Sequence, residues 1–155
     1  MMPFPSTSLP FGWNLWIAAR MMTLFAKRRP LDEILRRATP DAGSRAYTEL
    51  APAEIVVAVK ASVARPWRMR GRPCLREGLL AFHYLSLAGH RPVLHFGIVP
   101  KTAATAHPRA HCWLSVNGET VLNPPLEPML DLFSYDGRSA IPAETGRRLA
   151  GVAHG

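Results

Sequence analysis

Cysteine is scarce in this chain of 155 residues, which has only Cys74 and Cys112. Two cysteines are too few for the disulfide framework of a small secreted domain, so the sequence indicates a reducing compartment, and the cytoplasm is the expected location. The two cysteines form no Cys-x-x-Cys pair, and the sequence therefore gives little reason to expect zinc. We expect neither a bound metal nor an organic cofactor.

The chain also lacks an apolar run long enough to cross a membrane. Residues 11–26 are fewer than the roughly 20 that a spanning helix needs, and they include Arg20. No small-residue cleavage site follows them, so we expect no signal peptide and no transmembrane segment. The spacing of Trp13, Trp16 and Leu24 instead predicts an amphipathic helix, which either packs on its own domain or docks on a partner or membrane surface.

Acidic residues are few: the chain has 11 Asp and Glu against 19 Lys and Arg, a formal net charge of +8. Residues 1–77 hold most of the excess, with 13 basic residues against 6 acidic ones. A solvated basic face explains this imbalance, and an acidic peptide or protein would suit it too. The basic segment 65–72 surrounds Trp67, which is only a weak signal for nucleic acid and fits the rim of an active site equally well. We expect no nucleic-acid partner.

Strand patterns are absent from the first 70 residues, and the apolar spacing there predicts helices. Later segments combine one more helix with short alternating runs, and Asn117-Gly118 between two such runs predicts a β-hairpin. The predicted helices are 11–26, 31–37, one that opens at 50–54 and ends before Pro66, and 73–88; the predicted strands are 93–99, 110–116 and 119–123.

Cys74 stands where a turn ends and the helix from Pro73 begins. A thiol in the first turn of a helix lies at the positive end of the helix dipole, which favours the thiolate, so Cys74 is the leading candidate nucleophile. Such a thiol needs an imidazole nearby, and the imidazole needs a third group to orient it. His111 and Asn123, on the two strands of the hairpin, can be neighbours if a bulge or strand twist shifts their register. Cys112 is next to His111 on the same strand and therefore points to the opposite face, so we expect Cys112 to pack in the core and not to take part in catalysis.

Four segments around these residues occur together and in order: Arg72-Pro73-Cys74-Leu75-Arg76-Glu77-Gly78-Leu79-Leu80, Leu87-Ala88-Gly89-His90-Arg91-Pro92, His95-Phe96-Gly97, and Ala110-His111-Cys112-Trp113. They closely resemble the leader peptidases of lasso-peptide biosynthesis, the B-type proteins with a transglutaminase-like, papain-related cysteine-protease fold. The resemblance covers roughly residues 65–136.

The resemblance implies a cysteine peptidase that removes the leader from a ribosomally synthesised precursor peptide before the macrolactam forms. It assigns the nucleophile to Cys74, the histidine to His111 and the third position to Asn123. The family commonly has Asp at that third position, and Asp131 and Asp136 are alternatives. The substrate-binding residues that we expect are Trp67, Arg72, His95 and Trp113.

The same resemblance implies three partners. They are the precursor peptide itself, a separate PqqD-like leader-recognition protein, because this N-terminal half lacks strands for a winged-helix recognition domain, and an ATP-dependent asparagine-synthetase-like lasso cyclase. Two other functions stay open: a transglutaminase-like acyl transferase, and a non-catalytic basic module that binds protein or nucleic acid.

These inferences predict an α+β fold in which a helical N-terminal part packs on a small antiparallel sheet. We expect a flexible tail at 1–10, a single domain at 11–136 and a loosely ordered tail at 137–155. Within the domain, residues 11–64 are the helical part and residues 65–136 the catalytic core.

Overall fold

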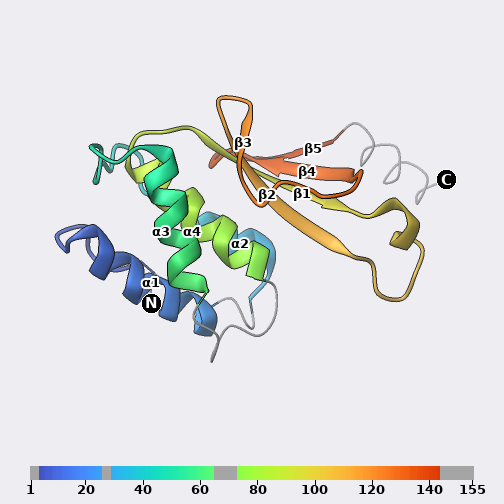
Figure 1. Ribbon diagram of the computed structural model, residues 1–155, viewed down its shortest axis with the longest axis horizontal. Coiled ribbons are helices and arrows are strands. Elements are labelled where there is room, and N and C mark those ends of the chain that lie inside the picture. Colours follow the sequence, from blue (N-terminus) through green and yellow to red (C-terminus); the bar gives the residue numbers. More distant parts are fainter. Residues whose placement is uncertain (1–3, 26–28, 65–72, 144–155) are drawn as a thin grey trace.

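The α+β prediction is confirmed by a computed structural model, which describes residues 4–25, 29–64 and 73–143. Helices gather on one side of the molecule and a single sheet forms the other (Figure 1). The helices are α1 (Phe11–Phe25), α2 (Leu31–Ala38), α3 (Pro52–Val63) and α4 (Pro73–Leu87). The strands are β1 (Pro92–Ile98), β2 (Ala110–Val116), β3 (Glu119–Leu122), β4 (Leu130–Tyr135) and β5 (Ala140–Pro142), with a short 3-10 helix, η1 (Pro100–Thr102), after β1.

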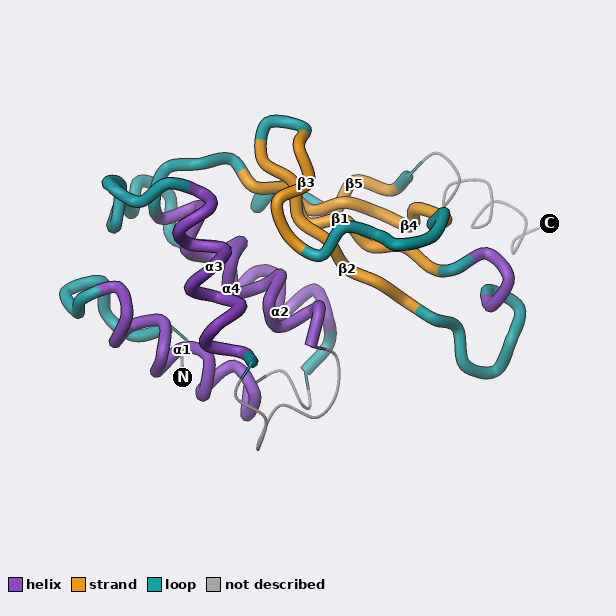
Figure 2. Tube along the Cα trace, viewed as in Figure 1, coloured by secondary structure: helices purple, strands orange, loops and turns teal. Residues whose placement is uncertain are grey.

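The sheet is antiparallel, with strand order β3-β2-β1-β4-β5. The predicted hairpin between β2 and β3 is confirmed, since Asn117 and Gly118 have φ values of 52° and 84°, as a tight turn of the type preferred in hairpins requires. Because β1 and β2 lie between β3 and β4, residues 123–129 must cross the sheet to reach β4. Figure 2 shows this connection passing over the strands.

One face of the sheet packs against α4. Cys112, Leu114 and Val116 alternate toward this face and are buried in the main core cluster. A Cβ atom added to Gly78 of α4 would lie 2.9 Å from Leu94 Cδ2 and 3.1 Å from Cys112 Sγ. The absence of a side chain at Gly78 therefore lets α4 lie close to the sheet.

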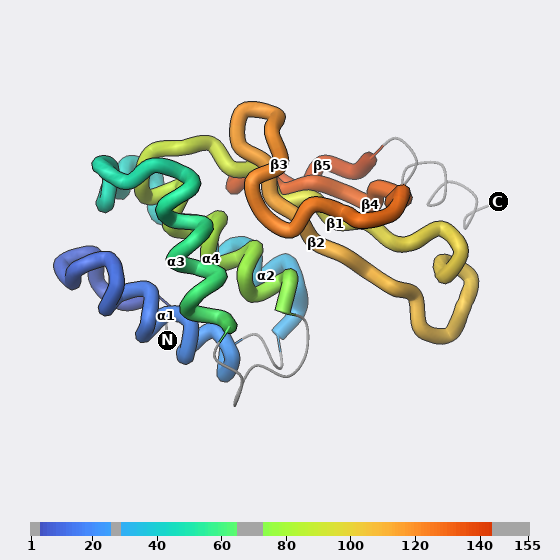
Figure 3. Tube along the Cα trace, viewed as in Figure 1, coloured from blue at the N-terminus to red at the C-terminus, as the bar shows by residue number. Residues whose placement is uncertain are grey.

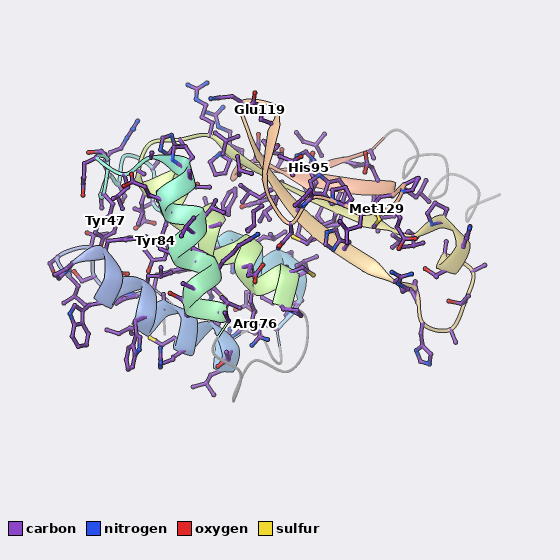
Figure 4. The ribbon with its side chains drawn as sticks, viewed as in Figure 1. Tyr47, Arg76, Tyr84, His95, Glu119 and Met129 are labelled. Carbon is purple, nitrogen blue, oxygen red and sulfur yellow. The ribbon has the colours of Figure 1, made fainter. Side chains whose placement is uncertain are left out.

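The opposite face, which we call the outer face, carries the residues that alternate with those facing α4. They are His95 and Gly97 of β1 and His111, Trp113 and Ser115 of β2. Figure 4 shows His95 in the sheet, whereas Tyr84 of α4 lies among the helices. The first residues after β3 leave the sheet at the end where β2 begins, so the 123–129 connection starts beside His111.

Helix α1 packs on its own domain and also presents an apolar surface outward. Leu15, Ala18 and Met22 are buried in the core, whereas the side chains of Trp13 and Trp16 are 66% and 45% exposed. Packing on its own domain, one of the two arrangements expected for this segment, is thus present, and the exposed tryptophans form a separate outward face of the same helix. Among the described residues, no helix has the length and apolarity that crossing a membrane would require.

Two segments outside the predicted domain of residues 11–136 lie on it. The ring of Phe4 stacks on His83, with 3.4 Å between ring centroids, and the hydroxyl of Tyr47 donates a hydrogen bond of 2.7 Å to the carbonyl oxygen of Leu9. Past residue 136, β5 pairs with β4. Three residues are too few to show an alternating pattern, so periodicity did not reveal β5.

Candidate active site

Helix α4 places Cys74 in its first turn, half-buried at the border of the core. The other cysteine, Cys112, is only 3% exposed. Burial raises the pKa of the Cys112 thiol, and the neighbouring Cys74 thiol raises it further. Cys112 therefore keeps its proton and fills space, as its place on the strand predicted, and Cys74 is the accessible thiol.

His111 stands near the start of β2, and its Nε2 atom lies 2.9 Å from the backbone carbonyl oxygen of Asn123. A carbonyl oxygen only accepts hydrogen bonds, so Nε2 must carry the hydrogen. In the neutral ring the other nitrogen, Nδ1, then has a free lone pair that can take a proton. This is the tautomer that a base acting on a thiol needs.

The contact between His111 and Asn123 differs from the expected one, because it uses the main chain of Asn123 rather than its side chain. The β2–β3 register shifts between Leu114 and Ser115, and continuing the pairing past Leu114 and Leu122 puts Asn123 opposite Trp113, two residues from His111 and on the same face of the sheet. Asn123 then takes a left-handed conformation with φ of 51°, which Asn tolerates better than most residues. Its Nδ2 atom is buried and has no hydrogen-bond partner in the described part of the chain.

The three residues expected in the triad lie at one end of the sheet. Cys74 is close enough to Cys112 to act on its pKa, and Cys112 is the chain neighbour of His111. Alternation along β2 points His111 toward the outer face, and no hydrogen bond joins it to Cys74 among residues 73–143. Cys74 lies on the α4 side of the sheet, beside Cys112, so the catalytic pair requires the His111 ring to turn from the outer face toward α4 when substrate binds.

Trp113 holds the rings of two histidines on the outer face. Its ring stacks on His95 and on His111, with centroid distances of 5.4 and 6.2 Å and nearly parallel planes. His95 is fixed further by a hydrogen bond of 2.7 Å between its Nε2 atom and Ser115 Oγ. Ser115 was not singled out from the sequence, although the alternation of residues 111, 113 and 115 would have placed it on this face.

Of the four predicted substrate-binding residues, two can be placed. His95 and Trp113 lie next to His111, but Trp113 is only 9% exposed and offers a substrate little surface. Trp67 and Arg72 lie outside the described residues. Because Trp113 is buried and stacks on His111, it positions the His111 ring and does not bind substrate directly.

The two alternative aspartates do not contact His111. Asp136 accepts hydrogen bonds from the backbone N–H groups of Arg138 and Ser139, and these bonds lower its pKa. It thus stabilises the turn between β4 and β5. Asp131 faces Gly97 across the β1–β4 pair and acts on the pKa of His95. Within the described ranges, no group of three or more His, Cys, Asp or Glu side chains is arranged to hold a metal ion.

A family model described as the transglutaminase-like superfamily matches residues 9–132. The chain belongs to the transglutaminase-like superfamily. The match runs from the residues before α1 into β4, so this transglutaminase-like domain includes both the helical part and the sheet that carries His111. No curated protein and no solved structure matches the chain.

Proposed function

We propose that this transglutaminase-like protein is a cysteine peptidase that removes the leader from a lasso-peptide precursor in the cytoplasm. One observation carries the proposal. The Nε2 atom of His111 is held by the Asn123 carbonyl group, at the end of the sheet where α4 presents Cys74. Superfamily membership supports thiol chemistry of this kind, and the resemblance of the segments around Cys74 and His111 supports a leader peptide as the substrate.

In the proposed mechanism, His111 Nδ1 takes the proton of Cys74 as Sγ attacks the carbonyl carbon of the scissile peptide bond. The backbone N–H of Cys74, at the start of α4, donates a hydrogen bond to the oxyanion. The peptide C–N bond then breaks, and the proton moves from His111 to the leaving amine, which becomes the N-terminus of the core peptide. His111 next takes a proton from water as the water oxygen attacks the thioester. The C–S bond then breaks, the leader leaves as a carboxylic acid, and His111 returns the proton to Cys74 Sγ.

The same arrangement serves an acyl transferase, in which an amine replaces water in the last step. The two reactions give products of different mass, because only the transferase joins the acyl group to the amine. A third function, a non-catalytic basic module, needs no thiol.

The test compares Cys74→Ala with the matched variant Cys112→Ala on a precursor peptide, in the presence of the leader-recognition protein. We expect Cys74→Ala to abolish leader release, with an unchanged circular dichroism spectrum, and Cys112→Ala to keep activity. Mass spectrometry with added amine separates hydrolysis from acyl transfer. Full leader release by Cys74→Ala would disprove the thiol mechanism and favour the non-catalytic module.

The partners belong to the same proposal. A separate PqqD-like recognition protein delivers the precursor, and an asparagine-synthetase-like cyclase consumes the amine that cleavage exposes. We propose that the recognition protein docks on the outward face of α1. This face carries Trp13, Trp16 and Leu24, and the guanidinium of Arg20 lies 3.5 Å from the centre of the Trp16 ring.

A further inference from the structure

A pocket of about 160 Å³ lies beside the candidate active site, where β1, β4 and the segment from β5 to Ala143 meet. Residues that line it include His95, Asp131, Phe133 and Ile141. An engineered protein cavity of about 150 Å³ holds a benzene molecule, so a pocket of this size accommodates one amino-acid side chain.

The charge of the pocket is opposite to that of the whole chain. Among the lining residues that the structure describes, Asp131 is the only carboxylate and none is Lys or Arg. Burial lowers the pKa of His95, although Asp131 opposes this effect, so the imidazole is neutral near pH 7. Asp131 has neither an ion pair nor a hydrogen bond within the described part of the chain. The formal charge of the described lining residues is therefore −1, in a protein of formal charge +8.

The pocket is also close to the proposed reaction centre. Gly97 faces His111 in the β1–β2 pair and Asp131 in the β1–β4 pair, so the three residues form one row across the sheet. Adjacent strands lie about 4.8 Å apart, which puts the backbone of Asp131 roughly 10 Å from that of His111. An extended peptide advances about 3.3 Å per residue, so its side chains up to about three residues from the scissile bond can reach the pocket.

We propose that this pocket binds the side chain of a lysine or arginine in the peptide substrate. The Asp131 carboxylate accepts hydrogen bonds from the cationic group, and Ile141 packs against the aliphatic stem. Asp131 is thus the residue that determines specificity in this proposal. The proposal rests on the proposed function because it requires a peptide substrate.

The first experiment measures binding alone and uses the full chain with Cys74→Ala. The probes are N-acetylated hexapeptide amides that place Lys, Arg, norleucine or Glu at each position in turn, and isothermal titration gives their Kd values. We expect Lys or Arg at one position to bind roughly 5- to 10-fold more tightly than norleucine, as for one partly exposed charge pair. Asp131→Asn should reduce this difference to less than twofold, and Asp131→Glu should keep it.

The matched control is Asp41→Asn, which removes an exposed carboxylate that does not line the pocket. Equal binding of Lys and norleucine peptides, or a cationic preference that survives Asp131→Asn, would overturn the pocket assignment.

The second experiment follows cleavage by the wild-type chain, in the presence of the leader-recognition protein, of precursor peptides that carry the same substitutions near the scissile bond. Cleavage that favours Lys or Arg only when Asp131 is present supports both proposals. Cleavage without any cationic preference contradicts the pocket assignment and leaves the peptidase intact. Selective binding by the Cys74→Ala chain, with no cleavage by the wild type, contradicts the peptidase and leaves the pocket assignment standing.

Discussion

Asn123 illustrates how a residue can hold a functional position through its main chain. Its carbonyl oxygen accepts the hydrogen bond that His111 Nε2 donates, and the residue has a left-handed φ of 51°. A carbonyl group orients the imidazole and fixes its tautomer, as a side-chain amide does. The missing aspartate at this position thus does not leave His111 without a partner.

We therefore predict that Asn123→Gly keeps leader release within about threefold of wild type. Glycine adopts a positive φ without steric cost, and the carbonyl group remains in place. Asn123→Ala should lower the free energy of unfolding by about 1 kcal/mol, because a left-handed conformation is unfavourable for alanine. Peptide cleavage and urea unfolding measure the two effects, and ring ¹⁵N shifts of His111 report whether Nε2 still carries the hydrogen. A hundredfold loss of cleavage in a stable Asn123→Gly chain would show that the side chain acts instead.

At the scale of the element, α1 is apolar on two sides. Its inner side contributes Leu15, Ala18 and Met22 to the core, and its outer side exposes Trp13 and Trp16. Trp and Arg are the residues most often found at the centre of protein interfaces. Helix α1 contains no acidic residue, which suits an acidic partner.

We predict that Trp13→Ala with Trp16→Ala weakens binding of the leader-recognition protein at least tenfold. Both rings are exposed, so the free energy of unfolding should change by only about 0.5 kcal/mol for each. Isothermal titration of the two proteins measures the affinity. Val57→Ala on α3, where the side chain is 67% exposed, is the control and should leave the affinity unchanged. Unchanged affinity in the double variant, or equally tight leader binding by this chain alone, would count against the docking face.

At the scale of the whole molecule, one core joins the helices to the sheet. His83 of α4 lies inside it, and its Nδ1 atom donates a hydrogen bond of 2.9 Å to the carbonyl oxygen of Ala38 at the end of α2. Burial lowers the pKa of His83 from 6.5 to about 4, and the hydrogen bond to Ala38 opposes this shift only in part. The fold thus holds this histidine neutral where the unfolded chain would protonate it.

This difference predicts how stability depends on pH. Between about pH 6.5 and pH 4 the unfolded chain binds more protons than the folded one, so the free energy of unfolding falls as the pH is lowered. The His83 contribution to this loss is ~3 kcal/mol at pH 4. Urea unfolding at pH 7, 5.5 and 4.5 measures the trend. His83→Asn, which keeps a hydrogen-bond donor but does not titrate, should be less stable at pH 7 and show a flatter trend. An identical pH dependence in both chains would refute the assignment.

Local sequence determined the four helices, the first three strands and the position of the candidate nucleophile, but it did not reveal β4 or β5. Apolar spacing predicted the four helices, Asn117-Gly118 predicted the hairpin, and Pro73 predicted the helix start that carries Cys74, because the interactions behind these features join residues close in the chain. The alternation of side chains along one strand was enough to predict that Cys112 is buried and that His111 points to the other face. These predictions needed no knowledge of which segments meet.

Only the tertiary structure decided what lies around His111. The connection from β3 across the sheet, the hydrogen bond from His111 to the Asn123 carbonyl oxygen, and the pocket of Asp131 all depend on how the strands pair and connect. A shift of one residue in strand pairing changes which side chains and carbonyl groups face each other, and no local pattern records it. For that reason the sequence pointed to Asn123 as the partner of His111 and to its side chain as the contact, whereas the fold supplied the carbonyl oxygen.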